Sequence, residues 1–515
     1  MERHYKWVAT FLVMIGTFMT LLDATIVDIS LPKMMAELDA DMIGIQWVII
    51  TYLLSSAIGM SMIGWLGERV SSRTIYLVAL AIFTACSFLC GQAASLTQMN
   101  TFRLMQGIGG GLIVPIGMVI LYEVFPEEEL GLAMGAFGFG VAFAPAMGPT
   151  IGGYVTETLH WRWIFYINVP VGIIGLFLSF LFLREKKKEK VQGGGFDLLG
   201  FLLMTAMLSS LILFLARGQE KEWLHSDFIL YMLITFLISA LLFIFWELRV
   251  KTPFIDLRVF RSQPFSLTII SFALTSAAIY GSFIILPLYL QRLRLYPTLT
   301  SGLIMLPGGI ICALALMASG VLADKTSPKY GLVWGGLVLM TFAHLLLSHL
   351  DFYTSKWAIA FIYWIPINIA WGFTFASANT IALGSVPEEK VSTASSIATV
   401  TMQVAGCIGT AIAVTNLERG IAYYFEAFSS HLTYKNAVAI GTMQKFIAYL
   451  TQKGIPPELA LMKGKAFMEL YVTAHATAYA FQWTFLFPAI LLALGIPLGF
   501  FIRYKRRETR RMIVV

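Results

Sequence analysis

Charged side chains are scarce in this chain of 515 residues. Asp, Glu, Lys and Arg together make up 13% of the sequence, whereas soluble domains carry about 25%. Hydrophobic residues account for 58%, and the mean hydropathy is +0.77. This balance excludes an ordinary water-soluble globular protein and predicts an all-α integral membrane protein.

Further absences narrow the class of protein. The four cysteines are Cys86, Cys90, Cys312 and Cys407. All fall in apolar runs, so we expect small buried side chains there rather than disulfides or metal ligands. No Gly-rich loop ends in Lys followed by Ser or Thr, which argues against ATP hydrolysis, and no cofactor or metal site is expected. The first apolar run continues to Pro32 without a small-residue cleavage site, so no removable signal peptide is expected.

Apolar runs recur along the whole chain. Each is about 20 residues long, enough to cross roughly 30 Å of hydrocarbon. The expected spans lie near residues 8–31, 45–65, 75–94, 100–122, 132–155, 164–183, 196–216, 227–247, 265–290, 299–322, 331–350, 357–383, 394–416 and 479–502. The sequence therefore predicts about fourteen transmembrane helices.

Lys and Arg are unevenly distributed between the connecting segments. They concentrate in the segments that are cytoplasmic if the N-terminus is inside, which predicts that both termini are cytoplasmic. The net charge of +7 is then explained by topology, and no nucleic-acid partner is expected. We expect a multi-pass protein of the cell membrane, inner or plasma, with the lipid bilayer as its surroundings.

An internal repeat predicts the architecture. The loop Gly64–Arg73 follows the second span, and the loop Gly320–Lys329, 256 residues later, follows the tenth with small, acidic and basic residues in matching positions. Two related halves that meet at a central site are typical of secondary transporters. We therefore expect a six-helix bundle in 1–183, a linker with two additional spans in 184–263, and a second six-helix bundle in 264–515.

The repeated loops also suggest a conformational latch at the cytoplasmic face, held by charge pairs and helix-end dipoles. The alternative is an anchor that only obeys the positive-inside rule. The latch residues would be Gly64, Glu68, Arg69, Arg73, Gly320, Asp324, Lys325 and Lys329.

The fifth expected span carries small residues at four-residue spacing together with prolines. Such spacing lets helix backbones approach closely in a membrane, and neighbouring groups can form hydrogen bonds with the backbone carbonyls that proline leaves unpaired. A tightly packed, bendable helix is expected. The residues are Gly140, Pro145, Gly148, Pro149, Gly152 and Gly153.

Three charged residues fall within hydrocarbon. Asp23 lies past the middle of the first span, Asp28 lies closer to the outer interface, and Arg103 enters the fourth span from the outer side. A charge at the bilayer centre costs about 2.5 kcal/mol or more on insertion scales, so these residues are candidates for proton coupling. The alternatives are a hydrogen-bonded packing acid for Asp23, a solvated helix-end acid for Asp28, and a structural role for Arg103.

Several motifs resemble those of the major facilitator superfamily. The two latch loops resemble its signature loop, Arg103, Gln106 and Gly107 resemble its fourth-span motif, and Gly148–Gly153 is similar to its antiporter motif. Leu22–Pro32 resembles the first span of the fourteen-span drug:proton antiporter branch (EmrB/QacA type). Trp161–Pro170 and Pro253–Phe260 are similar to the EmrB type within it. The chain departs from these patterns at Glu68, Ser71, Asp28 and 127–131.

The resemblance implies a proton-coupled multidrug efflux antiporter that exports hydrophobic or cationic toxic compounds by alternating access. A proton-coupled exporter of a specific lipid, siderophore or metabolite is the alternative. An enzyme is not expected, because His344 and His349 have no evident array of partners.

Residues 417–478 are too rich in charge to span a membrane and predict two amphipathic helices outside the bilayer, with a turn at Gly454. The resemblance implies a membrane-fusion adaptor protein as partner, for which this segment is either a docking surface or merely a cap on the last two spans.

Overall fold

Apolar helices make up most of the part of the molecule that the structure describes. The computed structural model describes residues 2–185, 195–325, 330–430 and 437–501. Within this part, twelve helices are long and apolar enough to cross a membrane, and two shorter apolar stretches, Leu130–Ala144 and Gly331–Leu347, complete the set. Each coincides with one of the expected spans, so the predicted fold class is confirmed.

The first six spans form one bundle. They are α1 (Glu2–Glu37), α3 (Trp47–Arg69), α4 (Ser72–Gln92), α5 (Leu96–Val124), α6 (Leu130–Thr158) and α8 (Asn168–Phe182), with short helices α2 (Met42–Ile45) before α3 and α7 (Trp163–Tyr166) before α8. Side-chain caps fix two of the starts. The Ser71 hydroxyl accepts from the Thr74 amide at 3.2 Å, and the Ser95 hydroxyl accepts from the Gln98 amide at 3.3 Å.

Two additional spans, α9 (Leu198–Arg217) and α10 (Asp227–Arg249), follow the first bundle. They pack on each other, and α9 also contacts α3 and α16. Their outer faces carry large exposed apolar side chains such as Leu202, Leu241 and Phe245. A helix pair with so much exposed apolar surface belongs at the lipid-facing edge of the protein.

The last six spans form the second bundle. They are α11 (Gln263–Leu288), α12 (Thr298–Lys325), α13 (Tyr330–Leu347), α15 (Ile365–Gly384), α16 (Val391–Ser429) and α18 (Pro457–Phe500). A π-helical turn, Tyr289–Leu293, ends α11, and short helix α14 (Lys356–Ala358) with a second π-helical turn, Ile359–Trp364, precedes α15. Short 3-10 turns, Glu127–Glu129 and Glu388–Lys390, lead into α6 and α16.

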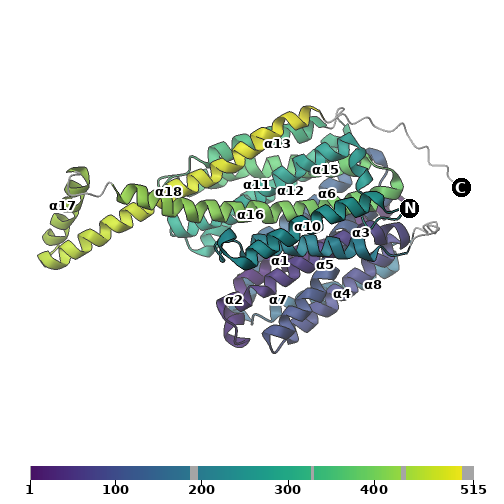
Figure 1. Cartoon of the computed structure of the whole chain (residues 1–515), viewed down its shortest axis with the longest axis horizontal. Helices are drawn as coiled ribbons and strands as arrows, with labels where there is room; N and C mark the ends of the chain where they lie inside the picture. Colours follow the sequence, from purple (N-terminus) through teal and green to yellow (C-terminus); the bar gives the residue numbers. More distant parts are fainter. Residues whose placement is uncertain (1, 186–194, 326–329, 431–436, 502–515) are drawn as a thin grey trace.

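Helices α16 and α18 extend beyond the bundles. Helix α17 (Ala437–Gln452) and the first part of α18 form a hairpin that projects from the end of the molecule far from the N-terminus (Figure 1). The turn contains Gly454 at a φ of +85°, where a side chain would be strained, and stacked rings of Phe446 and Phe467, 4.0 Å apart, join the two helices. The predicted pair of helices is present, and its second member is continuous with the last span.

Candidate functional site

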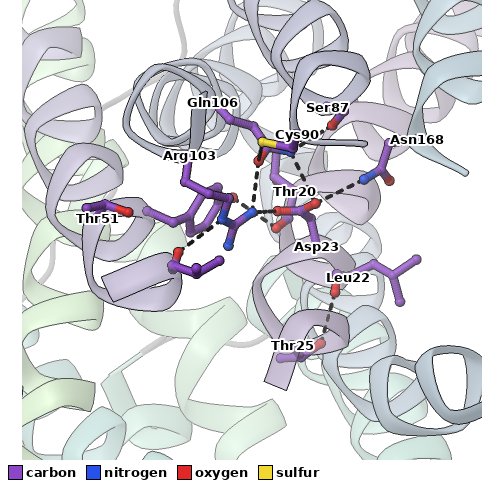
Figure 2. A network of polar contacts seen from close by, with 12 residues as sticks. Thr20, Leu22, Asp23, Thr25, Thr51, Ser87, Cys90, Arg103, Gln106 and Asn168 are labelled. Atoms are coloured by element: carbon purple, nitrogen blue, oxygen red, sulfur yellow. Dashed lines mark hydrogen bonds and ion pairs between the residues drawn. The ribbon is translucent and has the colours of Figure 1, made fainter. Parts of the chain in front are cut away.

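A buried polar network surrounds Asp23 within the first bundle. The Asp23 carboxylate accepts from Arg103 Nη1 at 2.5 Å, from Gln106 Nε2 at 3.1 Å and from Asn168 Nδ2 at 3.0 Å (Figure 2). Asp23 and Arg103 are each only 1% exposed. Helices α1, α5 and α8 thus bring one carboxylate and its three donors together in a region that excludes water.

Arg103 is also held by helix α3. Its Nε donates to the Val48 carbonyl at 3.1 Å, and its guanidinium lies over the Tyr52 ring, 4.2 Å from the centroid. The Tyr52 hydroxyl in turn donates to the Thr20 carbonyl of α1 at 3.1 Å. Cation–π contact and hydrogen bonds together compensate for the desolvation of the arginine.

A second layer of the network fixes the orientation of Gln106. Its Nε2 donates to Ser87 Oγ at 2.7 Å, and its Oε1 accepts from Arg103 Nη1 at 2.8 Å. The side chain therefore bridges α4 to the ion pair. In this arrangement the positive charge of Arg103 and the two amide groups stabilise the ionised form of Asp23.

The sequence singled out Asp23, Arg103 and Gln106, and the structure places all three in this network. The side chain of Asp28, one turn further along α1, lies outside the described side chains. Asn168 and Ser87 were not predicted as site residues. A polar residue inside an apolar run was the available signal for Asn168, which lies between two otherwise apolar stretches of the Trp161–Pro170 motif.

Gly107 allows α3 and α5 to approach closely beside the network. A Cβ at Gly107 would lie 2.0 Å from Ser55 Oγ and 2.6 Å from the Tyr52 carbonyl oxygen. Any larger residue at this position would displace the helix that carries Tyr52 and Val48. The close contact between α3 and α5 therefore supports the position of Arg103.

Two glycines of the antiporter-like motif pack α6 against α1 next to Asp23. A Cβ at Gly148 would lie 2.1 Å from Thr25 Oγ1, and a Cβ at Gly152 would lie 2.8 Å from Ile26 Cγ1. Gly153 has nothing within 4 Å, and Gly140 has its nearest neighbour at the ordinary distance of 3.4 Å. The side chains of Pro145 and Pro149 lie outside the described side chains.

The first latch loop contacts the second bundle. Glu68 Oε1 lies 3.0 Å from Lys390 Nζ, just before α16, and 3.4 Å from Thr393 Oγ1. Lys390 Nζ also lies 3.3 Å from Asp256 Oδ2, in the segment that follows α10. The acidic residue of the loop therefore joins the two bundles and the additional span pair through one lysine.

The two arginines of this loop contact residues of the first bundle, whereas Gly64 and Gly67 lie beside later parts of the chain. The Arg69 guanidinium lies over the Trp65 ring, 4.4 Å from the centroid, and Arg73 Nη2 donates to the Phe180 carbonyl at 2.5 Å. A Cβ at Gly64 would meet its nearest neighbour, the Phe254 carbonyl oxygen, at 3.6 Å. Gly64 therefore has room for a methyl group in this conformation.

The second latch loop contacts the first bundle. The Asp324 carboxylate accepts from the backbone amides of Gly131 at 2.9 Å and Leu132 at 2.8 Å, at the start of α6. A carboxylate is stabilised there by the unpaired amides and the dipole of the helix. A Cβ at Gly320 would lie only 2.1 Å from the Gly131 carbonyl oxygen. Lys325 ends α12 and is exposed, and Lys329 lies outside the described residues.

The two latch loops thus have pseudo-symmetric targets. Each contacts the start of the fifth span of the opposite bundle, α16 for Glu68 and α6 for Asp324. The same tripeptide, Pro-Glu-Glu, precedes each target, as Pro126–Glu128 before α6 and Pro387–Glu389 before α16. This short second repeat was the signal that could have revealed the partners of the latch from the sequence.

Contacts between the bundles continue inward from the latch. Ser396 Oγ donates to the Met60 carbonyl at 2.8 Å, Ser395 Oγ donates to the Pro115 carbonyl at 2.8 Å, and Gln403 Nε2 donates to the Leu53 carbonyl at 2.9 Å. From Glu68 to Leu53 the contact runs for about 22 Å along α3, at about 1.5 Å per residue. The bundles are closed together at the latch end.

A narrow cavity, too small to hold a water molecule in this closed conformation, lies between the bundles near this end. Its walls are mostly apolar and aromatic, and the side chain of Asn379 supplies a carbonyl oxygen that has no hydrogen-bond partner among the described residues. The lining residues are Val114, Met118, Phe137, Phe272, Phe375, Asn379, Ala398, Thr399 and Met402.

Comparisons with known proteins agree with this architecture. A family model described as the Major Facilitator Superfamily matches residues 13–410. The chain is 29% identical over 412 residues to the multidrug export protein EmrB of Escherichia coli (strain K12), covering 79% of each chain. It is 29% identical over 444 residues to the fatty acid resistance protein FarB of Neisseria gonorrhoeae, covering 86% of each. The crystal structure of the human organic anion transporter MFSD10 (TETRAN) shares the fold, with a TM-score of 0.57 at 14% identity, covering 95% of this chain and 99% of that one.

Proposed function

Because the chain belongs to the Major Facilitator Superfamily, we propose that it is a proton-driven exporter whose two bundles expose a central cavity to the two sides of the membrane in turn. The observation that carries this proposal is the buried ion pair between Asp23 and Arg103. An acid kept in hydrocarbon is costly, and such residues mark ion and proton pathways in transporters.

Asp23 binds and releases the driving proton in this proposal. In the present conformation the carboxylate is charged and is neutralised by Arg103. When the bundles rearrange and Arg103 moves away, the isolated carboxylate takes up a proton, because an unpaired charge in a low-dielectric region is unfavourable. Asp28, on the same helix, is a second candidate for proton coupling.

Helix α3 links proton binding to the opening of the latch. It holds Arg103 through Val48 and Tyr52, and the next residue, Leu53, accepts a hydrogen bond from Gln403 of the second bundle. A shift of Arg103 therefore acts on the helix that closes the bundles. Glu68 and Asp324 then serve as the latch, stabilising the conformation in which this end is closed.

Hydrophobic or cationic toxic compounds are the proposed substrates. The cavity offers aromatic rings, methionines and one free carbonyl oxygen, which suit apolar molecules that carry a hydrogen-bond donor or a cation. The similarity to EmrB supports a multidrug exporter. The similarity to FarB supports the second candidate, an exporter of a lipid such as a fatty acid.

We further propose that both termini are cytoplasmic, so the hairpin of α17 and α18 stands on the outer side of the membrane. Its distance from the bundles makes it a candidate docking surface for a membrane-fusion adaptor protein. Deletion of 425–470 is then expected to abolish copurification of the adaptor without abolishing membrane insertion.

The test uses the purified full chain in liposomes with an imposed pH gradient and a panel of dyes, drugs and fatty acids. We expect export by the natural chain and loss of its proton dependence in Asp23→Asn, with Asp28→Asn and the double variant tested beside it. Asp39→Asn, an exposed acid after the same helix, is the matched control. Unchanged proton-dependent export in Asp23→Asn and in the double variant would refute the assignment, and the compounds moved would separate the two substrate classes.

A further inference from the structure

Two buried carboxyl groups, Glu247 and Asp197, lie together at the end of the additional spans, outside the network around Asp23. Glu247 is near the end of α10 and is 0% exposed, and Asp197 precedes α9 and is 8% exposed. An acid buried in a membrane protein without a role in the main pathway calls for a physical account.

Asp197 has the partners of an ionised carboxylate. Its Oδ1 accepts from the Gly200 amide at 2.9 Å, which caps α9, and from Trp246 Nε1 at 2.9 Å. The indole also lies 3.1 Å from Oδ2. These donors stabilise a negative charge at Asp197.

Glu247 has the surroundings of a neutral carboxylic acid. Its Oε2 lies at the long distance of 3.4 Å from the Ile255 amide, the Phe254 amide also faces the carboxyl group, and its Oε1 is buried without a hydrogen-bond partner among the described residues. A Cβ at Gly200 would lie 2.4 Å from Glu247 Oε1 and 2.5 Å from Asp197 Oδ2. The two oxygens are therefore within about 5 Å of each other, where two negative charges repel.

Ion pairs among the described residues do not compensate for this repulsion. Neither Glu247 nor Asp197 forms an ion pair within the part of the chain that the structure describes. Asp256, a third acid in this region, is paired with Lys390, and the Arg258 guanidinium donates to the Val250 carbonyl. A buried charge that lacks a partner is expensive, and protonation removes the cost.

We propose that Glu247, adjoining the charged Asp197, is a proton-binding site of the additional span pair, and that its protonation supports the closed latch. The coupling runs through Phe254–Asp256. Ile255 contacts Glu247, Phe254 lies against the latch loop at Gly64, and Asp256 binds the same lysine as Glu68. Loss of the proton places a new negative charge between Asp197 and Asp256, which pushes this segment away and weakens the latch. The link to a transport cycle rests on the proposed function, but the proton site does not.

Proton binding is measured directly by infrared difference spectroscopy of the reconstituted full chain between acidic and alkaline buffers. We expect a carboxylic-acid carbonyl band that is lost at alkaline pH in the natural chain, is missing in Glu247→Gln and is kept in Asp227→Asn. Asp227 is an exposed acid at the opposite end of α10 and serves as the control. A spectrum of Glu247→Gln identical to that of the natural chain would overturn the proposal.

A second variant tests the pairing of the two acids and keeps the proposal falsifiable if Glu247→Gln folds poorly. Asp197→Asn retains a helix cap but removes the neighbouring negative charge, so the band should be lost at a lower pH. A midpoint that stays in place would contradict the pairing. If the natural chain exports nothing under a pH gradient while the band behaves as expected, the proposed function fails and the proton site stands.

Discussion

Gly320→Ala should open the latch end of the protein. In the closed conformation the new methyl carbon would lie 2.1 Å from the Gly131 carbonyl oxygen and 3.3 Å from Gly135 Cα. Both neighbours are backbone atoms of α6, so no side chain can turn aside. Helices α6 and α12 must separate by roughly 1 Å to reach ordinary contact.

The size of the effect follows from overpacking. Inserting a methyl group into a tightly packed contact costs about 1–3 kcal/mol. The cost applies only where α6 and α12 touch, because a conformation with this end open separates them. A differential cost of about 1–3 kcal/mol changes the ratio of the two conformations by about 5–150-fold.

Cysteine labelling measures this ratio. The reporter is Thr399→Cys, in the cavity behind the latch, in a chain whose four native cysteines are replaced, and a membrane-impermeant thiol reagent is added from the latch side. We expect Gly320→Ala to raise the labelling rate at least about fivefold. Gly64→Ala, at the equivalent position of the repeat, has room for its methyl group and should leave the rate unchanged. Equal rates in the two variants would refute the reasoning.

Three further predictions concern the ion pairs and the helix packing. Asp23→Asn leaves the buried Arg103 without its counter-charge and should destabilise the protein by about 3–5 kcal/mol, seen as a lower melting temperature in detergent. Asp23→Asn combined with Arg103→Gln should regain much of this stability, and an equally unstable double variant would contradict the pairing. Gly148→Ala should destabilise the protein by about 1–3 kcal/mol and so lower its melting temperature. Gly153→Ala should leave the melting temperature unchanged, because nothing lies within 4 Å of a Cβ at Gly153. Equal melting temperatures for the two variants would contradict this packing argument. Lys390→Met removes two partly exposed ion pairs, with Glu68 and Asp256, each worth about 0.2–1 kcal/mol, so labelling of the Thr399→Cys reporter should rise by about 2- to 30-fold, and an unchanged rate would contradict the role of Lys390 in the latch.

The sequence predicted the spans and singled out Asp23 and Arg103 as buried charges because strong physical constraints act on them. Hydrocarbon thickness determines the length of an apolar run, and a charge buried at the depth of Asp23 needs a partner, for which Arg103 was available at a similar depth. Asn168 and Ser87 are uncharged, and no comparable energetic penalty forces them to a particular neighbour. Their place in the network depends on helix rotation, which the sequence pattern does not determine.

The latch loops show the same limit of prediction from the sequence. The repeat revealed Gly64 and Gly320 as equivalent positions, but a Cβ has room at one and not at the other. The difference comes from the partner helix: Gly320 lies against a glycine backbone of α6, whereas Gly64 lies beside Phe254 and Ile255 of the segment after α10. The inserted span pair thus breaks the symmetry that the repeat suggests.

The unbroken course of α18 from the projecting hairpin into the second bundle gives the protein a lever. From Pro457 to residue 480 the helix measures about 35 Å, at about 1.5 Å per residue. A rocking of about 10° in the second bundle would sweep the tip through roughly 6 Å. Such a rocking of the second bundle would therefore move any molecule bound at that tip.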